Sequence, residues 1–105
     1  MAVTGELEQA VMDILWSRAE SLSVRDVHDL ISAERDLAYT TVMTVLDRLA
    51  KKGLVLRNLD GRAWLYRPAN SRADEVASEV LELLSRLTAA ERGEVLTRIA
   101  ASRPA

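Results

Sequence analysis

The sequence contains no cysteine and no phenylalanine, and it has a single histidine, His28. Without cysteine the chain cannot form a disulfide, use a thiol nucleophile or hold a metal through thiolates. One histidine is too few for a typical zinc site, and neither Ser23 nor Ser32 lies in the sequence context of a nucleophile elbow. No glycine-rich phosphate loop occurs. We therefore predict that the protein is not an enzyme and uses no cofactor or metal, and that His28 is a solvated polar residue.

Long apolar stretches are missing as well. No run of 18 apolar residues could span a membrane, and the first residues, with Glu6 and Glu8, lack the basic and then apolar pattern of a secretory signal. We expect a cytoplasmic protein with no membrane partner. Of the 105 residues, 49% are hydrophobic but only 4% are aromatic, which predicts one small domain with an aliphatic core. Such a domain is marginally stable alone and gains from burial against a partner subunit.

Charge is distributed unevenly, although the formal net charge is only −2. Residues 35–72 carry eight basic and three acidic side chains, a net charge of +5, whereas the rest of the chain has a net charge of −7. A basic middle between acidic ends is typical of a nucleic-acid-binding surface. From charge alone, a chance cluster on a solvated face is an equally good interpretation.

Apolar residues recur at helical spacing in two segments near the start of the chain. The first predicted helix begins after Thr4, which can cap it, and ends near Ser17. The second begins at Ser23 with a near capping box and ends at about residues 33–34. Residues 21–23, between the two helices, could form a short strand.

A third helix is predicted over residues 38–52, with Gly53 as its left-handed stop. Its apolar stripe consists of Val42, Val45, Leu46 and Leu49. The opposite face holds Thr40, Thr44, Asp47, Arg48 and Lys51, flanked by Thr41 and Met43. The threonine hydroxyl can form hydrogen bonds with base edges, and the threonine methyl can contact the methyl group of thymine. The cations can neutralise phosphates. Asp47 would repel phosphates unless Arg48 or Lys51 pairs with it.

The pattern then changes to that of a β-hairpin over residues 54–68. Its strands are expected at residues 54–58 and 63–67, joined by an Asp60-Gly61 turn. Three helices followed by a two-stranded wing is the order of a winged helix-turn-helix, which is an α+β, mainly helical fold.

Side chains on the wing add a second possible contact with nucleic acid. Arg57, Arg62 and Arg67 are spaced so that one or more could lie against a DNA backbone or minor groove. Trp64 and Tyr66 point to the same face by strand alternation. They could stack on bases, but we favour the interpretation that they hold the wing to the core.

Two more helices are predicted after the wing, one from Ser71 to about Leu87 and one opened by a capping box at Thr88 and Glu91. The apolar arc of the first is wider than one packing contact needs, which favours docking against a second copy of the chain. The alternative is an extension that closes over its own domain. The expected dimerisation residues are Val76, Val80, Leu81, Leu84, Leu87, Leu96 and Ile99.

These observations divide the chain into a DNA-binding winged helix, residues 1–69, and a helical dimerisation segment, residues 70–105. The predicted partners are double-stranded DNA and a second copy of the chain, with half-sites about one helical turn, ~34 Å, apart or a multiple of that. The residues expected to bind DNA are Thr40, Thr41, Thr44, Arg48, Lys51, Lys52 and Arg62. Because winged-helix folds are reused and a fold alone does not fix a function, a protein-interaction module without DNA binding stays the alternative.

Three motifs resemble a known family. Residues 7–16 read LEQAVMDILW, residues 39–54 read YTTVMTVLDRLAKKGL, and Gly61-Arg62 precedes a Tyr-Arg-Pro sequence. In combination they resemble the bacterial repressors of β-lactamase and penicillin-resistance genes and the related copper-operon repressors, over about two thirds of the chain. The resemblance implies a homodimer that binds a palindromic operator and blocks transcription. It also implies that the third helix reads the groove, that Gly61-Arg62 lies in the wing, and that the C-terminal helices dimerise.

The chain departs from this family at the start of the third helix. Familiar members have Ser-Pro there, whereas this sequence has Ala38-Tyr39, so the helix cap either shifts to Asp36 or is lost. The copper branch carries a cysteine-rich metal motif, and the absence of cysteine excludes that mode of sensing. Residues alone do not separate a repressor from a DNA-binding activator; the resemblance favours the repressor.

Overall fold

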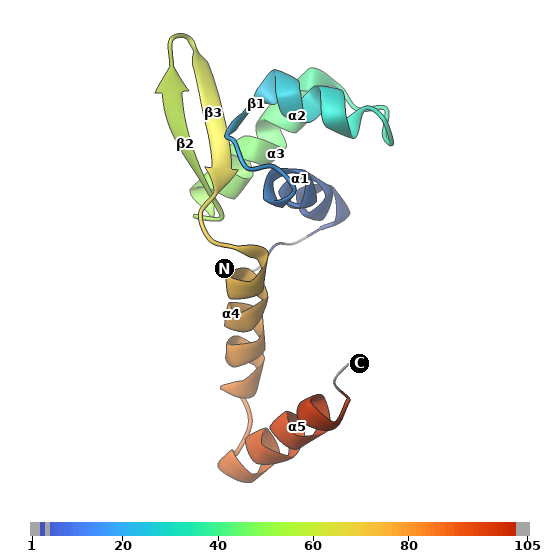
Figure 1. Cartoon of the computed structure of the whole chain (residues 1–105), viewed down its shortest axis with the longest axis vertical. Helices are drawn as coiled ribbons and strands as arrows, with labels where there is room; N and C mark the ends of the chain where they lie inside the picture. The colour runs from blue at the N-terminus through green and yellow to red at the C-terminus, as the bar shows by residue number, and fades with distance from the viewer. Residues whose placement is uncertain (1–2, 4, 103–105) are drawn as a thin grey trace.

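The computed structural model describes residue 3 and residues 5–102 of the chain (Figure 1). Its elements follow the order α1 (Glu6–Trp16), β1 (Leu22–Ser23), α2 (Val24–Ile31), α3 (Tyr39–Lys51), β2 (Val55–Asp60), β3 (Ala63–Pro68), α4 (Arg72–Leu84) and α5 (Ala89–Ala101). This is the predicted order, and it confirms an α+β, mainly helical winged helix-turn-helix. None of the helices in the described residues has the length and apolar character of a membrane span.

The three strands form one antiparallel sheet in the order β1-β3-β2. The short strand expected at residues 21–23 is present as β1, where Leu22 pairs with Tyr66. The strand β2 extends beyond its predicted end at residue 58, because Asp60 still pairs with Ala63. Gly61-Arg62 is left as the loop. Gly61 has a φ of +63°, as the first position of a type II′ hairpin loop requires.

The core is aliphatic, as the composition predicts, and it lies between the first three helices and the sheet. The predicted stripe of α3 is entirely inside it: Val42, Val45, Leu46 and Leu49 are buried. The helix α1 contributes Val11, Met12 and Leu15, α2 contributes Val27 and Ile31, and the strands and the start of the wing contribute Leu22, Leu54, Val55 and Tyr66. Burying one face of α3 leaves its opposite face toward solvent.

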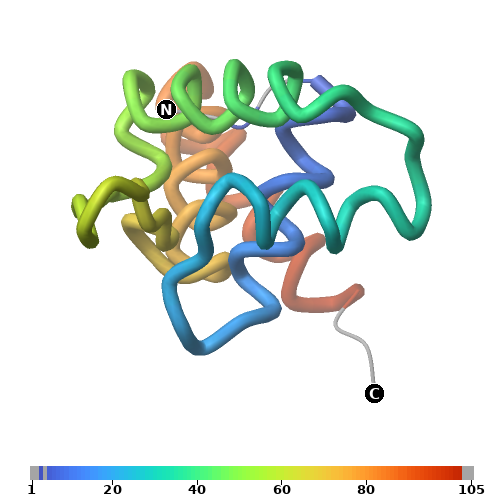
Figure 2. The backbone as a smooth tube through the Cα atoms, turned by 90° about the horizontal axis from the view of Figure 1, so that it is seen from above, coloured from blue at the N-terminus to red at the C-terminus, as the bar shows by residue number. Residues whose placement is uncertain are grey.

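The turn between α2 and α3 differs from the prediction in two ways. Figure 2 shows the two helices side by side, joined at one end by this turn. The helix α2 ends at Ile31, earlier than expected, and the Ser32 hydroxyl donates to the His28 carbonyl at 2.6 Å. His28 is not a solvated residue: its half-buried ring donates from Nε2 to the Leu37 carbonyl at 2.7 Å and meets the edge of Tyr39. The prediction was wrong because the loop returns over the ring, a contact that helical periodicity cannot show.

Three of the five helices in the described residues begin with the side-chain cap that the sequence predicts. The side chains of Ser23, Ser71 and Thr88 each accept from the backbone N–H three residues on. Thr4, the expected cap of α1, lies outside the described residues, and the N-cap position is Gly5, without a side-chain bond. At α3 the cap is lost rather than shifted to Asp36, since Ala38 occupies the N-cap position and has no side chain that could accept a bond.

The last two helices project away from the winged helix and give the molecule a long axis of 53 Å (Figure 1). The base of α4 is tied to α1. The Trp16 indole donates to the Asn70 carbonyl at 3.0 Å, and Arg72 lies over the Trp16 ring while pairing with Asp13 at 3.2 Å. Trp16 therefore packs at the edge of the core. Leu87 lies beyond the end of α4, which stops at Leu84, so it was wrongly assigned to that helix.

Leu46 on α3 provides a test of this core. Replacing Leu46, which is fully buried, by alanine should lower the free energy of unfolding by about 2–5 kcal/mol, because it removes apolar contacts and leaves a cavity. Urea unfolding followed by circular dichroism at one fixed protein concentration measures the change. The matched control is Leu59→Ala at an exposed position on the wing, with an expected change below about 0.5 kcal/mol. Equal losses for both variants would contradict the assigned core.

Candidate nucleic-acid interface

The exposed face of α3 carries the predicted hydroxyl and cationic side chains. Thr40, Thr44, Arg48 and Lys51 are exposed, and Thr41 is half-buried beside them. The Thr44 hydroxyl donates to the Thr40 carbonyl at 2.9 Å, so its hydrogen is used within the helix. This face therefore combines threonine methyls and oxygens with cations near the C-terminal end of α3. These are groups that suit contacts in a major groove.

Lys51 and Lys52 are neighbours in sequence but lie in different environments. The Lys51 side chain is 77% exposed, whereas that of Lys52 is 20% exposed and its ammonium lies 2.7 Å from Glu8 on α1. The Glu8 carboxylate is buried, and Arg48 reaches it at 3.9 Å. A buried carboxylate needs a paired cation. Glu8 therefore joins α1 to the C-terminal end of α3 and holds Lys52 in the α1–α3 interface.

The negative charge of Asp47 is compensated by two cations. Lys51 lies 3.1 Å from one carboxylate oxygen and Arg57, on β2, lies 3.4 Å from the other. The hydrogen bond from Lys51, with the charges of Lys51 and Arg57, lowers the pKa of the Asp47 carboxyl below its usual value. The expected condition, that a neighbouring cation pairs with Asp47, is met by Lys51.

Arg57 also connects α3 to the wing. Its guanidinium lies 4.8 Å from the centre of the Trp64 ring while it pairs with Asp47. Tyr66 is buried and holds β3 to the core, as predicted, but Trp64 is exposed. The prediction was wrong for Trp64 because this residue lies two positions closer to the wing tip, beyond the reach of the core.

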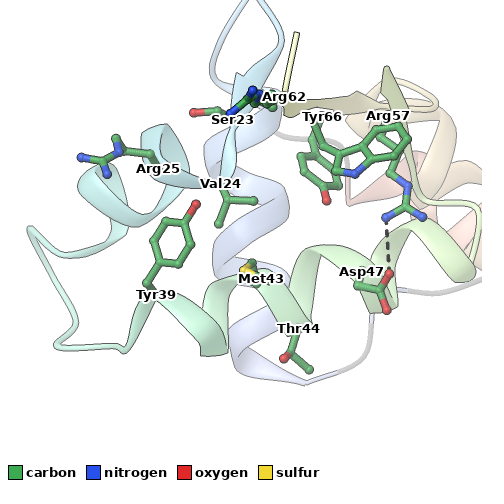
Figure 3. Close-up of a pocket in the computed structure, with 12 residues that line it drawn as sticks. Ser23, Val24, Arg25, Tyr39, Met43, Thr44, Asp47, Arg57, Arg62 and Tyr66 are labelled. Atoms are coloured by element: carbon green, nitrogen blue, oxygen red, sulfur yellow. Dashed lines mark hydrogen bonds and ion pairs between the residues drawn. The ribbon is translucent and has the colours of Figure 1, made fainter. Parts of the chain in front are cut away.

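A cleft of about 710 Å³ lies between α3, the wing and the start of α2 (Figure 3). Arg62, at the wing tip, lines it together with Thr44 and Asp47 of α3. Of the residues predicted to bind DNA, this cleft brings together Thr44 and Arg62. Arg25, Tyr39 and Met43 also line the cleft. No role was predicted for Arg25 or Tyr39, and Met43 was placed only at the flank of the exposed face. Tyr39, Met43 and Asp47 follow a spacing of four residues, and that signal was available in the sequence.

The predicted dimerisation residues lie on and near α4 and α5, the two helices that project from the winged helix (Figure 1). Exposed side chains among them are Val76, Leu81, Leu96 and Ile99. Leu83 of α4 is exposed as well, although it was not assigned to the interface. Leu84 is buried within the chain, and Val80 and Leu87 are half-buried. The two groups of predicted residues therefore occupy separate surfaces.

The fold, with the basic, threonine-bearing face of α3 beside a wing, defines a protein of the winged helix-turn-helix class. The particular family follows from comparison with known proteins. The family model described as penicillinase repressor matches residues 4–105, and the chain belongs to this family. The resemblance stated from the three motifs is confirmed.

Two relatives in sequence show how far the similarity extends. The chain is 58% identical over 81 residues to the transcriptional regulator BlaI of Mycobacterium tuberculosis (strain ATCC 25618 / H37Rv), a match that covers 77% of this chain and 59% of that protein. It is 28% identical over 92 residues to an uncharacterized 16.5 kDa protein of Latilactobacillus sakei, which covers 88% of this chain and 62% of that one. The chain thus spans about 60% of the length of these relatives.

Solved structures agree with the winged-helix assignment. The DNA-binding domain of the repressor BlaI matches with a TM-score of 0.60 and 25% identity, over 70% of this chain and 90% of that one. Monomeric Bacillus licheniformis BlaI in complex with the blaP half-operator matches with a TM-score of 0.57 and 27% identity, over 68% of this chain and 85% of that one.

The different roles of the two neighbouring lysines can be tested by stability measurements. Lys52→Ala should lower the free energy of unfolding by about 2 kcal/mol, because it takes a close cation away from a buried carboxylate. Lys51→Ala is the matched control and should leave the urea midpoint nearly unchanged, since its side chain is solvated. If Lys51→Ala were the more destabilising variant, the assignment of Lys52 to the α1–α3 interface would be wrong.

Proposed function

We propose that the protein is a transcriptional repressor that binds a palindromic operator as a homodimer, with α3 in the major groove and the wing, residues 54–68, against the adjacent backbone. The observation that carries this proposal is the position of Thr44 on α3. It lines the cleft with the wing-tip Arg62, and it also lines a second hollow with Thr40, Thr41 and Arg48. Membership of the penicillinase repressor family supports it, as does the solved complex of a similar BlaI with a half-operator.

The proposed DNA contacts come from α3 and the wing. Thr40, Thr41, Thr44 and Arg48 would meet the groove, and Lys51 and Arg62 the phosphates. Lys52 would add positive charge near the backbone while Glu8 holds its ammonium at 2.7 Å, so its main contribution is to support the end of α3. The proposed function needs no catalysis and no cofactor. Because bacterial operators lie in the cytoplasm, we place the protein there.

The proposed homodimer forms through the C-terminal segment, residues 70–105, while residues 1–69 bind DNA. Leu81 is 65% exposed, and Val76, Leu96 and Ile99 are also more than half exposed. Apolar side chains gathered on two helices that project from the winged helix are costly to leave in water. A two-fold axis through this segment would bury them against their own copies and set two winged helices at two half-sites.

DNA binding is tested by fluorescence anisotropy with the DNA upstream of the protein's own gene, against random DNA, at two salt concentrations. Arg48→Ala should weaken specific binding by about 1–3 kcal/mol, whereas Arg62→Ala should weaken binding to all sequences and reduce the salt slope by about 1. The control is Arg86→Ala, at an exposed position beyond the end of α4. Unchanged affinity of both site variants would refute the assigned contacts. No binding at low salt would favour a protein-interaction module.

Dimerisation is tested by sedimentation equilibrium. Leu81→Arg should raise the dimer dissociation constant by at least ~10-fold, because it places a charge in an apolar interface. The control is Glu82→Gln at the next, exposed position, which should leave the constant nearly unchanged. A wild-type chain that stays monomeric at micromolar concentration, or a Leu81→Arg dimer as tight as wild type, would contradict the proposed interface.

A further inference from the structure

One side of the exposed face of α3 is apolar, and the core packing of the helix does not explain the presence of Met43 on it. Met43 is 46% exposed and Tyr39, one turn earlier, is 43% exposed, and both line the cleft beside the wing (Figure 3). The core face of α3 is already complete with Val42, Val45, Leu46 and Leu49, each 3% exposed or less. The folded chain therefore has no packing need for a long apolar side chain at position 43.

Thr44 extends this apolar side. Because its hydroxyl donates to the Thr40 carbonyl at 2.9 Å, its hydrogen is not free for a base edge, although its methyl is. Asp47 lies one turn beyond Met43, and its carboxylate pairs with Lys51 and Arg57. The side of α3 that faces the wing cleft therefore offers a phenol ring, a thioether and a methyl, followed by a charge that is already neutralised.

The major groove contains one strongly apolar feature, the C5-methyl group of thymine. A thioether side chain is unbranched, flexible and polarizable, and it adapts to a small apolar contact better than a branched side chain does. We propose that Met43 is a specificity-determining residue that contacts a thymine methyl in each half-site, with Tyr39 and Thr44 on either side of the contact. This inference rests on the proposed binding of α3 in the major groove, and it names the base feature that this surface recognises.

The test replaces single thymines by deoxyuridine, which removes one methyl and keeps the Watson–Crick and groove hydrogen-bonding groups. The tightest half-site is first selected from random duplexes with the wild-type chain, and each thymine is then replaced in turn. At one position the wild type should lose about 3–10-fold in affinity, the scale expected for one buried methyl. Met43→Ala should bind the thymine duplex about as weakly as wild type binds the deoxyuridine duplex, and should show no further loss on replacement.

Wild type and Met43→Ala, each measured on the thymine and the deoxyuridine duplex, form a double-mutant cycle, and two further variants at position 43 extend it. Met43→Leu keeps an apolar side chain of similar size and should retain the deoxyuridine penalty, whereas Met43→Gln should lose it. Because Met43 is exposed, all three variants should unfold at the wild-type urea midpoint, which separates a lost contact from a lost fold.

The outcomes distinguish this inference from the repressor proposal. DNA binding with no thymine sensitivity, or a Met43→Ala protein that keeps the full deoxyuridine penalty, would overturn the role of Met43 and leave the DNA-binding function intact. If the wild type bound DNA at none of the salt concentrations, both the role of Met43 and the repressor proposal would be overturned. A penalty that disappears only in Met43→Ala and Met43→Gln is the result we expect.

Discussion

Burial of one face of α3 is the constraint on which the rest of the structure depends. Four aliphatic side chains at helical spacing lie in a core built by α1, α2 and the sheet, each nearly inaccessible to water. Their burial fixes the rotation of the helix about its axis, so the side chains that remain outside are determined as well. The part of the candidate interface on α3, from Tyr39 to Lys51, is therefore the side of the helix that this packing leaves in solvent.

Electrostatic pairs then determine how the exposed cations are used. Glu8 is buried and holds Lys52, while Asp47 is shared by Lys51 and Arg57. Ion pairs of the first kind stabilise the position of α3 against α1, because a buried charge without its partner is costly. Pairs of the second kind lie at the surface, where salt and a competing phosphate can replace them. Lys52 thus helps to hold α3 in place, whereas Lys51 and Arg57 lie at the proposed binding surface.

Much of the fold could be predicted because its signals are local. The caps at Ser23 and Thr88 and the left-handed Gly53 depend on residues a few positions apart, and all three are present. The features that local patterns could not show depend on distant neighbours. His28 bonds to a loop nine residues on, and Lys52 pairs with a carboxylate 44 residues away in the sequence. Trp64 was misjudged because strand alternation indicates the face of a residue and not whether the core reaches it.

The candidate site shows the same division. By itself the sequence determined which residues share a face of α3, where the wing turns and where positive charge is concentrated, since these follow from helix period, turn chemistry and composition. Only the tertiary structure decided that Lys52 is held while Lys51 is solvated, that Arg57 connects α3 to Trp64, and that Met43 and Tyr39 line a cleft with Arg62. The reason is physical: the strength of a charge pair and the exposure of an apolar side chain depend on distance and burial, which are set when segments far apart in the chain pack together.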